Sequence, residues 1–393
     1  MPLPAGCLAA SLAGMNVRAG VVTRDKPPFR AEHIGSLLRP GSLLEQRACF
    51  ARGEISQADL TAAEDAAISG AVGLQESLGL RFATDGEFRR RSYHSFFYQQ
   101  LGDLSIDTVA GAHAKGAPAG GGRGAQPVAL IKSRVRWTHP VNVADFNFLK
   151  GKTKLLPKIT IPGPCALHFR GGDAAVLASA YRDIDEFWDD IVEAFTRELA
   201  ALAEAGCHYV QIDETAFAKF GDPDVQVALA ARGDDWSKLI DKYIGITNRV
   251  LRAAPKTLYI GMHLCRGNRG GHWHAEGSYE DVADRLFNAL EIPFYFLEFD
   301  SPRAGTFTPL RFVSNQKSVV LGLVSSKTPV LEDKDALCAR VEQASRHVSL
   351  DRLAVSPQCG FASIDTGNPV TLQAQEAKLR LVVELARDIW GEV

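Results

Sequence analysis

Short apolar runs alternate with longer amphipathic stretches along most of the chain. In the longer stretches apolar residues recur at three- and four-residue steps, as Phe187, Ile191 and Phe195 do, and this period is typical of helices. The short runs predict strands at 30–35, 81–85, 157–162, 208–213, 258–263, 295–299, 318–324 and 352–356. The amphipathic stretches predict helices near 56–79, 174–205, 235–253, 278–290, 332–347 and 370–391.

This alternation is typical of an α/β fold with a parallel sheet. Eight strands with helices between them favour a closed (β/α)8 TIM barrel over an open, doubly wound sheet. No G-x-G-x-x-G sequence follows an early strand, so the signature of a Rossmann nucleotide site is missing. We therefore expect one TIM-barrel catalytic domain over 29–393 and a flexible N-terminal leader over 1–28. The leader has no basic segment before its apolar part, which argues against a secretory signal.

The segment 103–156 interrupts the alternation because it is too long for an ordinary connection between a strand and a helix. It contains a glycine-rich run over 120–124 and then an alternating run over 128–137. We predict a flexible tip and a β-hairpin insertion, a candidate lid over the barrel mouth. The glycines do not predict a phosphate loop, since no G-K-[ST] follows them and no helix starts there.

Composition and charge exclude several classes of partner. Of the 393 residues, 46% are hydrophobic and 23% charged, as in ordinary globular proteins. The formal net charge of -2 offers no basic excess for the phosphates of nucleic acid. No apolar run is long enough for a transmembrane helix, so a membrane is not an expected partner. Seven scattered cysteines form no disulfide framework and favour reduced thiols and a cytoplasmic location.

Reactive side chains gather where the expected strands end, and in TIM barrels catalytic groups lie at the C-terminal strand ends. His263 and Cys265 are two residues apart, so an extended strand turns both toward the same side. Imidazole nitrogen and thiolate sulfur are zinc ligands. Cys359 would add a second thiolate and Glu298 an oxygen. An H-x-C pair alone is weak evidence, because a buried cysteine is usually a small apolar residue.

The order and spacing of these strand-end residues resemble the C-terminal catalytic barrel of cobalamin-independent methionine synthase, and especially its short single-barrel relatives. The resemblance covers roughly residues 29–392. It is carried by His33-Ile34-Gly35-Ser36, Thr84-Asp85-Gly86-Glu87-Phe88, Gln211-Ile212-Asp213-Glu214, Gly261-Met262-His263-Leu264-Cys265, Leu297-Glu298-Phe299-Asp300-Ser301 and Ser356-Pro357-Gln358-Cys359-Gly360.

The resemblance implies a zinc ion and a bound amino-acid thiol. The family's zinc ligands correspond to His263, Cys265, Glu298 and Cys359. Its thiol-binding residues correspond to Ile34, Gly35, Ser36, Glu87 and Asp213, and Phe169 lies near its aromatic substrate contact. Glu87 and Asp213 would pair with the amino group of the substrate, because a buried ammonium needs a carboxylate partner.

The implied activity is a zinc-dependent transfer of a methyl group to a thiol, with homocysteine as the acceptor and methionine as the product. The implied partners are therefore a small-molecule thiol and a methyl donor of the folate or methylcobalamin type. The family's proton-donating histidine corresponds to Lys327, and we take Lys327 as a catalytic residue. The acidic residue that contacts folate in the family corresponds to Lys219. These departures lie on the methyl-donor side, so a different alkyl electrophile is an alternative to folate.

Two other functions stay open. One is a different zinc-dependent thiol-alkyl transferase, for example one that opens an epoxide with a small thiol. The other is a non-catalytic zinc-binding or thiol-binding protein, although structural zinc sites usually use local C-x2-C pairs and these ligands come from distant strands. The sequence does not determine the oligomeric state, and a homodimer is the assembly that we consider.

Overall fold

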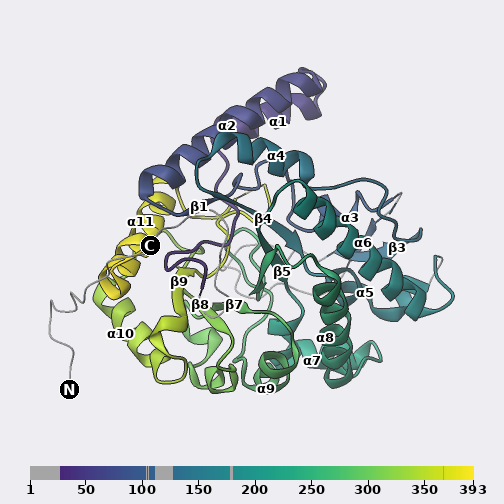
Figure 1. The fold of residues 1–393 in the computed structure, drawn as a ribbon. Coiled ribbons are helices and arrows are strands. Elements are labelled where there is room, and N and C mark those ends of the chain that lie inside the picture. Colours follow the sequence, from purple (N-terminus) through teal and green to yellow (C-terminus); the bar gives the residue numbers. More distant parts are fainter. Residues whose placement is uncertain (1–26, 103, 105, 111–126, 178–179, 366) are drawn as a thin grey trace.

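A curled sheet of seven parallel strands forms the centre of the molecule, and helices surround it (Figure 1). The computed structural model describes residues 27–393 apart from 103, 105, 111–126, 178–179 and 366. Neighbouring strands follow the order β1-β4-β5-β6-β7-β8-β9. Their bounds are β1 Phe82–Ala83, β4 Leu156–Pro162, β5 Tyr209–Glu214, β6 Tyr259–Leu264, β7 Phe294–Glu298, β8 Ser318–Val324 and β9 Leu353–Pro357.

The helices cover the outside of this sheet (Figure 1). They are α1 Gly41–Ala51, α2 Gln57–Leu78, α3 Ser95–Tyr98, α4 Val143–Lys152, α5 Ala166–Leu177, α6 Ile184–Glu204, α7 Pro223–Ala231, α8 Trp236–Ala253, α9 Glu280–Ala289, α10 Lys334–Ser345 and α11 Leu372–Trp390. Four short 3-10 helices are η1 Phe217–Gly221, η2 Pro302–Ala304, η3 Thr308–Phe312 and η4 Leu350–Arg352. None of the described helices is both long and apolar enough to cross a membrane.

The apolar periodicity predicted most of these helices, but the expected helix over 174–205 is two helices. The chain breaks between α5 and α6, and the side chain of Asp183 accepts a hydrogen bond from the backbone N–H of Asp185 to cap the start of α6. Within α6, Phe187, Ile191 and Phe195 are all buried, as their spacing predicts. Helices α1, α3, α4 and α7 were not predicted.

Seven of the eight expected strands are present, but the first one in the sequence, 30–35, is reduced to a single parallel bridge. That bridge joins Ala31 to Val355 of β9. On its other side the Thr84 hydroxyl donates a hydrogen bond to the carbonyl of Gly35, so the segment lies between the two edge strands. The pairing ends because the chain turns at Gly35, whose φ of 133° suits glycine. The parallel α/β sheet is therefore confirmed, whereas a full eighth strand is wrong.

The predicted insertion at 103–156 is shorter than expected. Strands β2 Ile106–Ala110 and β3 Pro127–Ile131 pair antiparallel, but 111–126 lies outside the described residues, so the hairpin and its role as a lid stay predictions. The rest of the segment belongs to the main fold, since it holds α4 and the start of β4. Most of the predicted leader, 1–26, also lies outside the described residues.

A buried ion pair occupies the interior of the sheet, away from the C-terminal strand ends. Lys158, near the start of β4, places Nζ 3.2 Å from Glu32 Oε2, and both side chains are 0% exposed. The Tyr209 hydroxyl donates a hydrogen bond of 2.7 Å to Glu32 Oε1. The Lys158 ammonium also lies 4.7 Å from the ring centroid of Phe82 and 4.5 Å from that of Phe296. These contacts supply the partners that two buried charges require.

His33 lies beside this ion pair and stays neutral. Its Nε2 is 2.9 Å from Gln75 Oε1, and its ring stacks on Phe82 with centroids 4.7 Å apart. Burial, and then the positive charge of Lys158, lower the pKa of His33 from 6.5 to about 3.

We expect the stability of the fold to fall as the pH is lowered from 6.5 toward 3. In that range the unfolded chain binds a proton at His33 and the native chain does not, whereas above pH 6.5 both states are neutral. The free energy of unfolding, measured with urea, should therefore be smaller at about pH 5.5 than at neutral pH. His33 alone should account for roughly 1.4 kcal/mol of this difference. The variant His33→Gln should show a smaller pH difference, and an unchanged difference would contradict the assignment.

Candidate metal and substrate site

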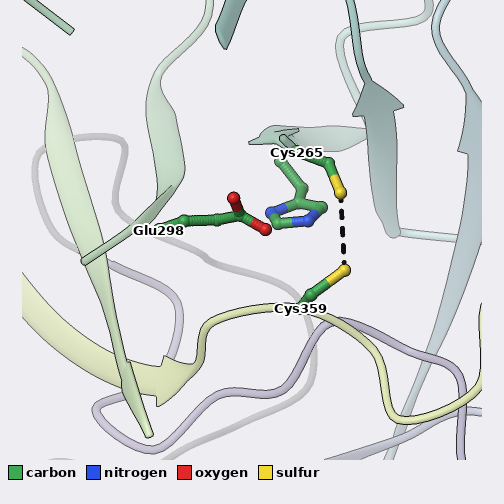
Figure 2. Close-up of side chains that lie close together, drawn as sticks. Cys265, Glu298 and Cys359 are labelled. Atoms are coloured by element: carbon green, nitrogen blue, oxygen red, sulfur yellow. Dashed lines mark hydrogen bonds between the residues drawn. The ribbon is translucent and has the colours of Figure 1, made fainter. Parts of the chain in front are cut away.

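Four potential metal ligands meet at the C-terminal ends of three strands. His263 is in β6 and Cys265 follows that strand, Glu298 is the last residue of β7, and Cys359 lies two residues past β9. All four are buried, and one ligand atom of each lies within 4.8 Å of all the others. Figure 2 shows the sulfur atoms of Cys265 and Cys359 pointing toward each other, with the Glu298 carboxylate facing the same space. The two-residue spacing in β6 thus turns His263 and Cys265 to one side, as the sequence predicts.

The chemistry of this quartet fits a zinc ion. The two Sγ atoms are 3.5 Å apart, and neither ring nitrogen of His263 has a hydrogen-bond partner among the described residues. Buried polar atoms normally have partners, so a buried imidazole with two unpartnered nitrogens indicates a bound ion or ligand at this position. One nitrogen, two sulfurs and a carboxylate oxygen form a donor set that zinc binds tetrahedrally.

The electrostatics of the quartet also favour a cation. The hydrogen bond with Cys359, and then burial, hold the pKa of the Cys265 thiol well above its usual value. A bound dication reverses this preference, because a coordinating thiol loses its proton. Glu298 is held on both sides: its Oε2 accepts a hydrogen bond of 3.0 Å from the Arg266 backbone, and its Oε1 lies 3.4 Å from Gln358 Nε2.

The quartet opens into a cavity of about 370 Å³. The cavity is lined by four of the predicted thiol-site residues together with three of the predicted metal ligands: Ile34, Ser36, Glu87, Asp213, His263, Cys265 and Cys359. The structure therefore brings the two predicted groups together at one site. Gly35 lies behind this wall, where a Cβ atom would come within 2.7 Å of Glu87 Oε1. Only glycine permits that close approach.

Glu87 is held in a strained backbone conformation. Its φ is 61°, and no other non-glycine residue of the described chain has a positive φ. Asp85 Oδ1 accepts a hydrogen bond of 2.8 Å from the Glu87 backbone N–H, and the hydroxyl of Thr160 donates one of 2.8 Å to Glu87 Oε1. Arg90 lies 3.6 Å from the other carboxylate oxygen. Strain of this kind persists where surrounding contacts impose it, and it gathers at functional sites.

Asp213, the second carboxylate of the cavity, has few partners. Its Oδ1 accepts a hydrogen bond of 2.6 Å from Gln211. Burial raises the pKa of Asp213 to about 7, and the negative charge of Glu87 also raises it, while His263 opposes the rise. Two nearby carboxylates in a buried cavity are stabilised by a bound cationic group, which an amino group supplies.

Besides Gly35 and Glu298, two predicted site residues lie outside the cavity lining. Lys327 is buried, and its Nζ donates a hydrogen bond of 3.0 Å to the carbonyl of Gly267, behind the loop that follows β6. Phe169 packs edge-on against Phe220 and lies 5.5 Å from the ammonium of Lys219. Neither side chain lines the cavity, so their direct roles stay predictions.

Arg170, Tyr93 and His274 also line the cavity. The glycine-rich loop that follows His263 and Cys265 made His274 a candidate for the substrate mouth, with an ordered surface loop as the alternative, whereas Arg170 and Tyr93 were not predicted. They lie in segments that follow strand ends at a distance, where periodicity carries no information. A signal was available for Arg170, because it is a long charged side chain that follows the end of β4 within a mostly apolar stretch of α5.

Residues 29–388 match the family model described as the catalytic domain of cobalamin-independent synthase. The uncharacterized protein YxjG of Bacillus subtilis is 38% identical, over 93% of this chain and 96% of its own length. A 5-methyltetrahydropteroyltriglutamate–homocysteine methyltransferase of Synechococcus is 23% identical over 85% of this chain. The chain spans only 40% of that longer relative.

Solved structures agree with these matches. The crystal structure of a putative vitamin-B12 independent methionine synthase from Listeria monocytogenes superposes with a TM-score of 0.71 at 31% identity, covering 93% of this chain and 99% of that one. A B12-independent methionine synthase from Shewanella, in complex with selenomethionine, shares the fold with a TM-score of 0.70 at 19% identity, covering 91% of this chain and 97% of its own.

The curled parallel sheet and its strand-end site define an α/β enzyme, and the family match extends over nearly all of the described chain. The protein belongs to the cobalamin-independent synthase family and corresponds to its catalytic domain. It is an enzyme of this family, whose named relatives are methyltransferases. The resemblance seen in the sequence is thereby confirmed.

Proposed function

We propose that this protein is a zinc-dependent methyltransferase that methylates the thiol of homocysteine to give methionine. The observation that carries the proposal is a cluster of four buried ligands, His263, Cys265, Glu298 and Cys359. Three of them line one cavity together with Glu87 and Asp213. A zinc ion held by the four ligands would lower the pKa of a bound thiol and keep it as the nucleophilic thiolate.

The residues around the quartet would orient the substrate. Glu87 and Asp213 would bind its ammonium group by charge-assisted hydrogen bonds. Ser36 lines the same part of the cavity and offers a hydroxyl donor to the substrate carboxylate. Thr160 and Arg90 hold the Glu87 carboxylate in place, so the amino acid meets a preorganised partner.

The thiolate and carboxylate ligands would have distinct tasks. Cys265 and Cys359 would stay bound throughout, because thiolate is the stronger ligand for zinc. Glu298 would be the ligand that yields to the substrate sulfur, since Arg266 and Gln358 can hold its carboxylate after it leaves. Lys327 would act through the Gly267 carbonyl, which positions the loop after β6.

The direct test is X-ray absorption at the zinc edge, with and without homocysteine. We expect one sulfur neighbour to be gained and one oxygen neighbour to be lost when homocysteine binds. 2-Aminobutyrate, which lacks only the thiol, should leave the spectrum unchanged. Bound zinc that does not respond to homocysteine would contradict the acceptor, and a folded protein that binds no zinc would contradict the ligand set.

A further inference from the structure

The curled sheet has a seam, which we define as the junction of its edge strands β1 and β9 across the segment 30–35. That segment makes a single parallel bridge with β9, and on the β1 side the Thr84 hydroxyl donates a hydrogen bond to the Gly35 carbonyl. The loops that leave the two edge strands, the β1 loop (84–94) and the β9 loop (358–365), meet at this seam. Sheet hydrogen bonds therefore do little to fix the distance between these two loops.

Arg39 connects the two loops. One terminal nitrogen of its guanidinium donates hydrogen bonds of 2.8 and 2.7 Å to the carbonyls of Glu87 and Arg90 in the β1 loop. The other terminal nitrogen donates hydrogen bonds of 3.0 and 3.4 Å to the carbonyls of Ala362 and Ile364 in the β9 loop. Two bonds from each terminal nitrogen match its two N–H groups, and the residue is only 6% exposed. One buried side chain thus holds both loops.

The guanidinium of Arg39 is suited to this bridge. Burial, and then the charge of Arg47, lower the pKa of Arg39 to about 10, while the charges of Glu87 and Asp365 raise it, so the group stays charged at neutral pH. A buried charge persists where its surroundings compensate it, as the four carbonyls and the two carboxylates do here. A lysine ammonium is a compact donor on a flexible stem, and it cannot bind both loops in the same way.

The seam separates the two ends of the proposed substrate. Cys359, a proposed metal ligand, lies at the start of the β9 loop, whereas Glu87, a proposed partner of the ammonium, lies in the β1 loop. Homocysteine that is bound at its sulfur and at its ammonium would therefore span the seam with its two methylene groups. The distance between the loops then decides which length of amino-acid thiol fits.

We infer that Arg39 is a positioning residue that sets this span, and that it thereby makes the site select homocysteine over cysteine, which is one methylene shorter. The inference rests on the proposed function. By binding the Glu87 carbonyl, Arg39 also supports the positive-φ conformation that places the Glu87 carboxylate. Because the guanidinium is anchored on both loops, the ammonium site stays at one distance from the metal, and a shorter thiol reaches only one end at a time.

The test compares the dissociation constants of homocysteine and cysteine for the zinc-loaded protein, measured by isothermal titration calorimetry. We expect the wild type to bind homocysteine at least about tenfold more tightly, because one methylene group gives roughly 10- to 200-fold discrimination. Arg39→Met should lower this ratio at least about fivefold, because the loosened seam no longer penalises the shorter thiol. 4-Mercaptobutanoate, which lacks the ammonium, should bind the wild type and the variant equally.

Two further variants sharpen the comparison. Arg39→Lys keeps the positive charge but should also lower the ratio, because one ammonium cannot hold both loops. Arg47→Met is the matched control, since Arg47 is a partly buried arginine of α1 that donates a hydrogen bond of 3.3 Å to the same Arg90 carbonyl and pairs with Glu64. Within the described residues none of its hydrogen bonds reaches the β9 loop. Its loss should leave the ratio unchanged.

The fold should survive the loss of Arg39. Independently of that side chain, the backbone N–H of Tyr93 donates a hydrogen bond of 3.1 Å to the Ser363 carbonyl, and that of Asp365 donates one of 3.0 Å to the Arg91 carbonyl. These contacts keep the two loops adjacent, so the seam should loosen without opening. The circular dichroism spectrum and the zinc content of each variant should match those of the wild type.

The outcomes separate this inference from the proposed function. The inference is wrong if the wild type binds homocysteine and cysteine equally, or if the ratio is unchanged in Arg39→Lys and Arg39→Met. It is also wrong if the variants lose zinc or all three thiols alike, or if Arg47→Met lowers the ratio as much, because each result assigns Arg39 a purely structural role. If the wild type binds neither amino-acid thiol, the proposed function itself fails. Should Arg39→Met not fold, the ratio in Arg39→Lys decides.

Discussion

Cys359→Ser should release the zinc ion and abolish thiol alkylation. Cys359 supplies the only expected ligand from the segment after β9, and its sulfur lies 3.5 Å from that of Cys265. A serine hydroxyl is a poor zinc ligand, and the three remaining donors come from two adjacent strands. Changing a residue that merely supports a metal ligand typically costs 10–100-fold in affinity, so we expect loss of a ligand to cost at least about 100-fold.

The measurement combines metal content after dialysis against a weak chelator with the rate of homocysteine alkylation. Cys338→Ser is the matched control, because it makes the same replacement of sulfur by oxygen in α10, outside the cavity lining. Both variants should give the same far-ultraviolet circular dichroism spectrum. An active Cys359→Ser protein without zinc would overturn the metal assignment.

Glu87→Gln should weaken homocysteine binding far more than it weakens the fold. The substitution keeps the size of the side chain and its hydrogen bond from Thr160, but it removes the negative charge that faces the substrate ammonium. Breaking one partner of a buried charge pair costs about 3–5 kcal/mol, which corresponds to a rise in KM of at least about 100-fold.

A matched thiol isolates this effect. 4-Mercaptobutanoate is homocysteine without its amino group, so its KM should change little between the wild type and Glu87→Gln. A variant that loses both thiols equally would indicate a structural role for Glu87, whereas a variant that still binds homocysteine normally would refute the ammonium contact.

The sequence predicts the metal site better than it predicts the substrate site, and the reason is geometric. His263 lies in β6 and Cys265 directly follows it, so the two-residue period of an extended chain fixes their common direction. Glu298 and Cys359 end or follow other strands of the same parallel sheet, whose carboxyl ends meet at one edge. Their selection from other strand-end residues nevertheless depended on the resemblance to a family.

Other features depend on contacts between distant segments and were not predictable from local pattern. The positive φ of Glu87 follows from hydrogen bonds with Asp85 and Thr160, and the turn at Gly35 ends the expected first strand. The position of Arg170 and Lys219 at the cavity is visible only when the surrounding segments are placed. Periodicity reports which face is buried, and it carries no information on such pairings.

The buried pair of Glu32 and Lys158 ties together two parts of the chain that are 126 residues apart in sequence. Loss of either charge would leave the other without a partner in the interior, whereas joint replacement by apolar residues can be neutral. Substitutions at these two positions should therefore be inherited together during evolution. A chimera that takes its first strand segment from one relative and β4 from another should fold only when both positions come from the same parent.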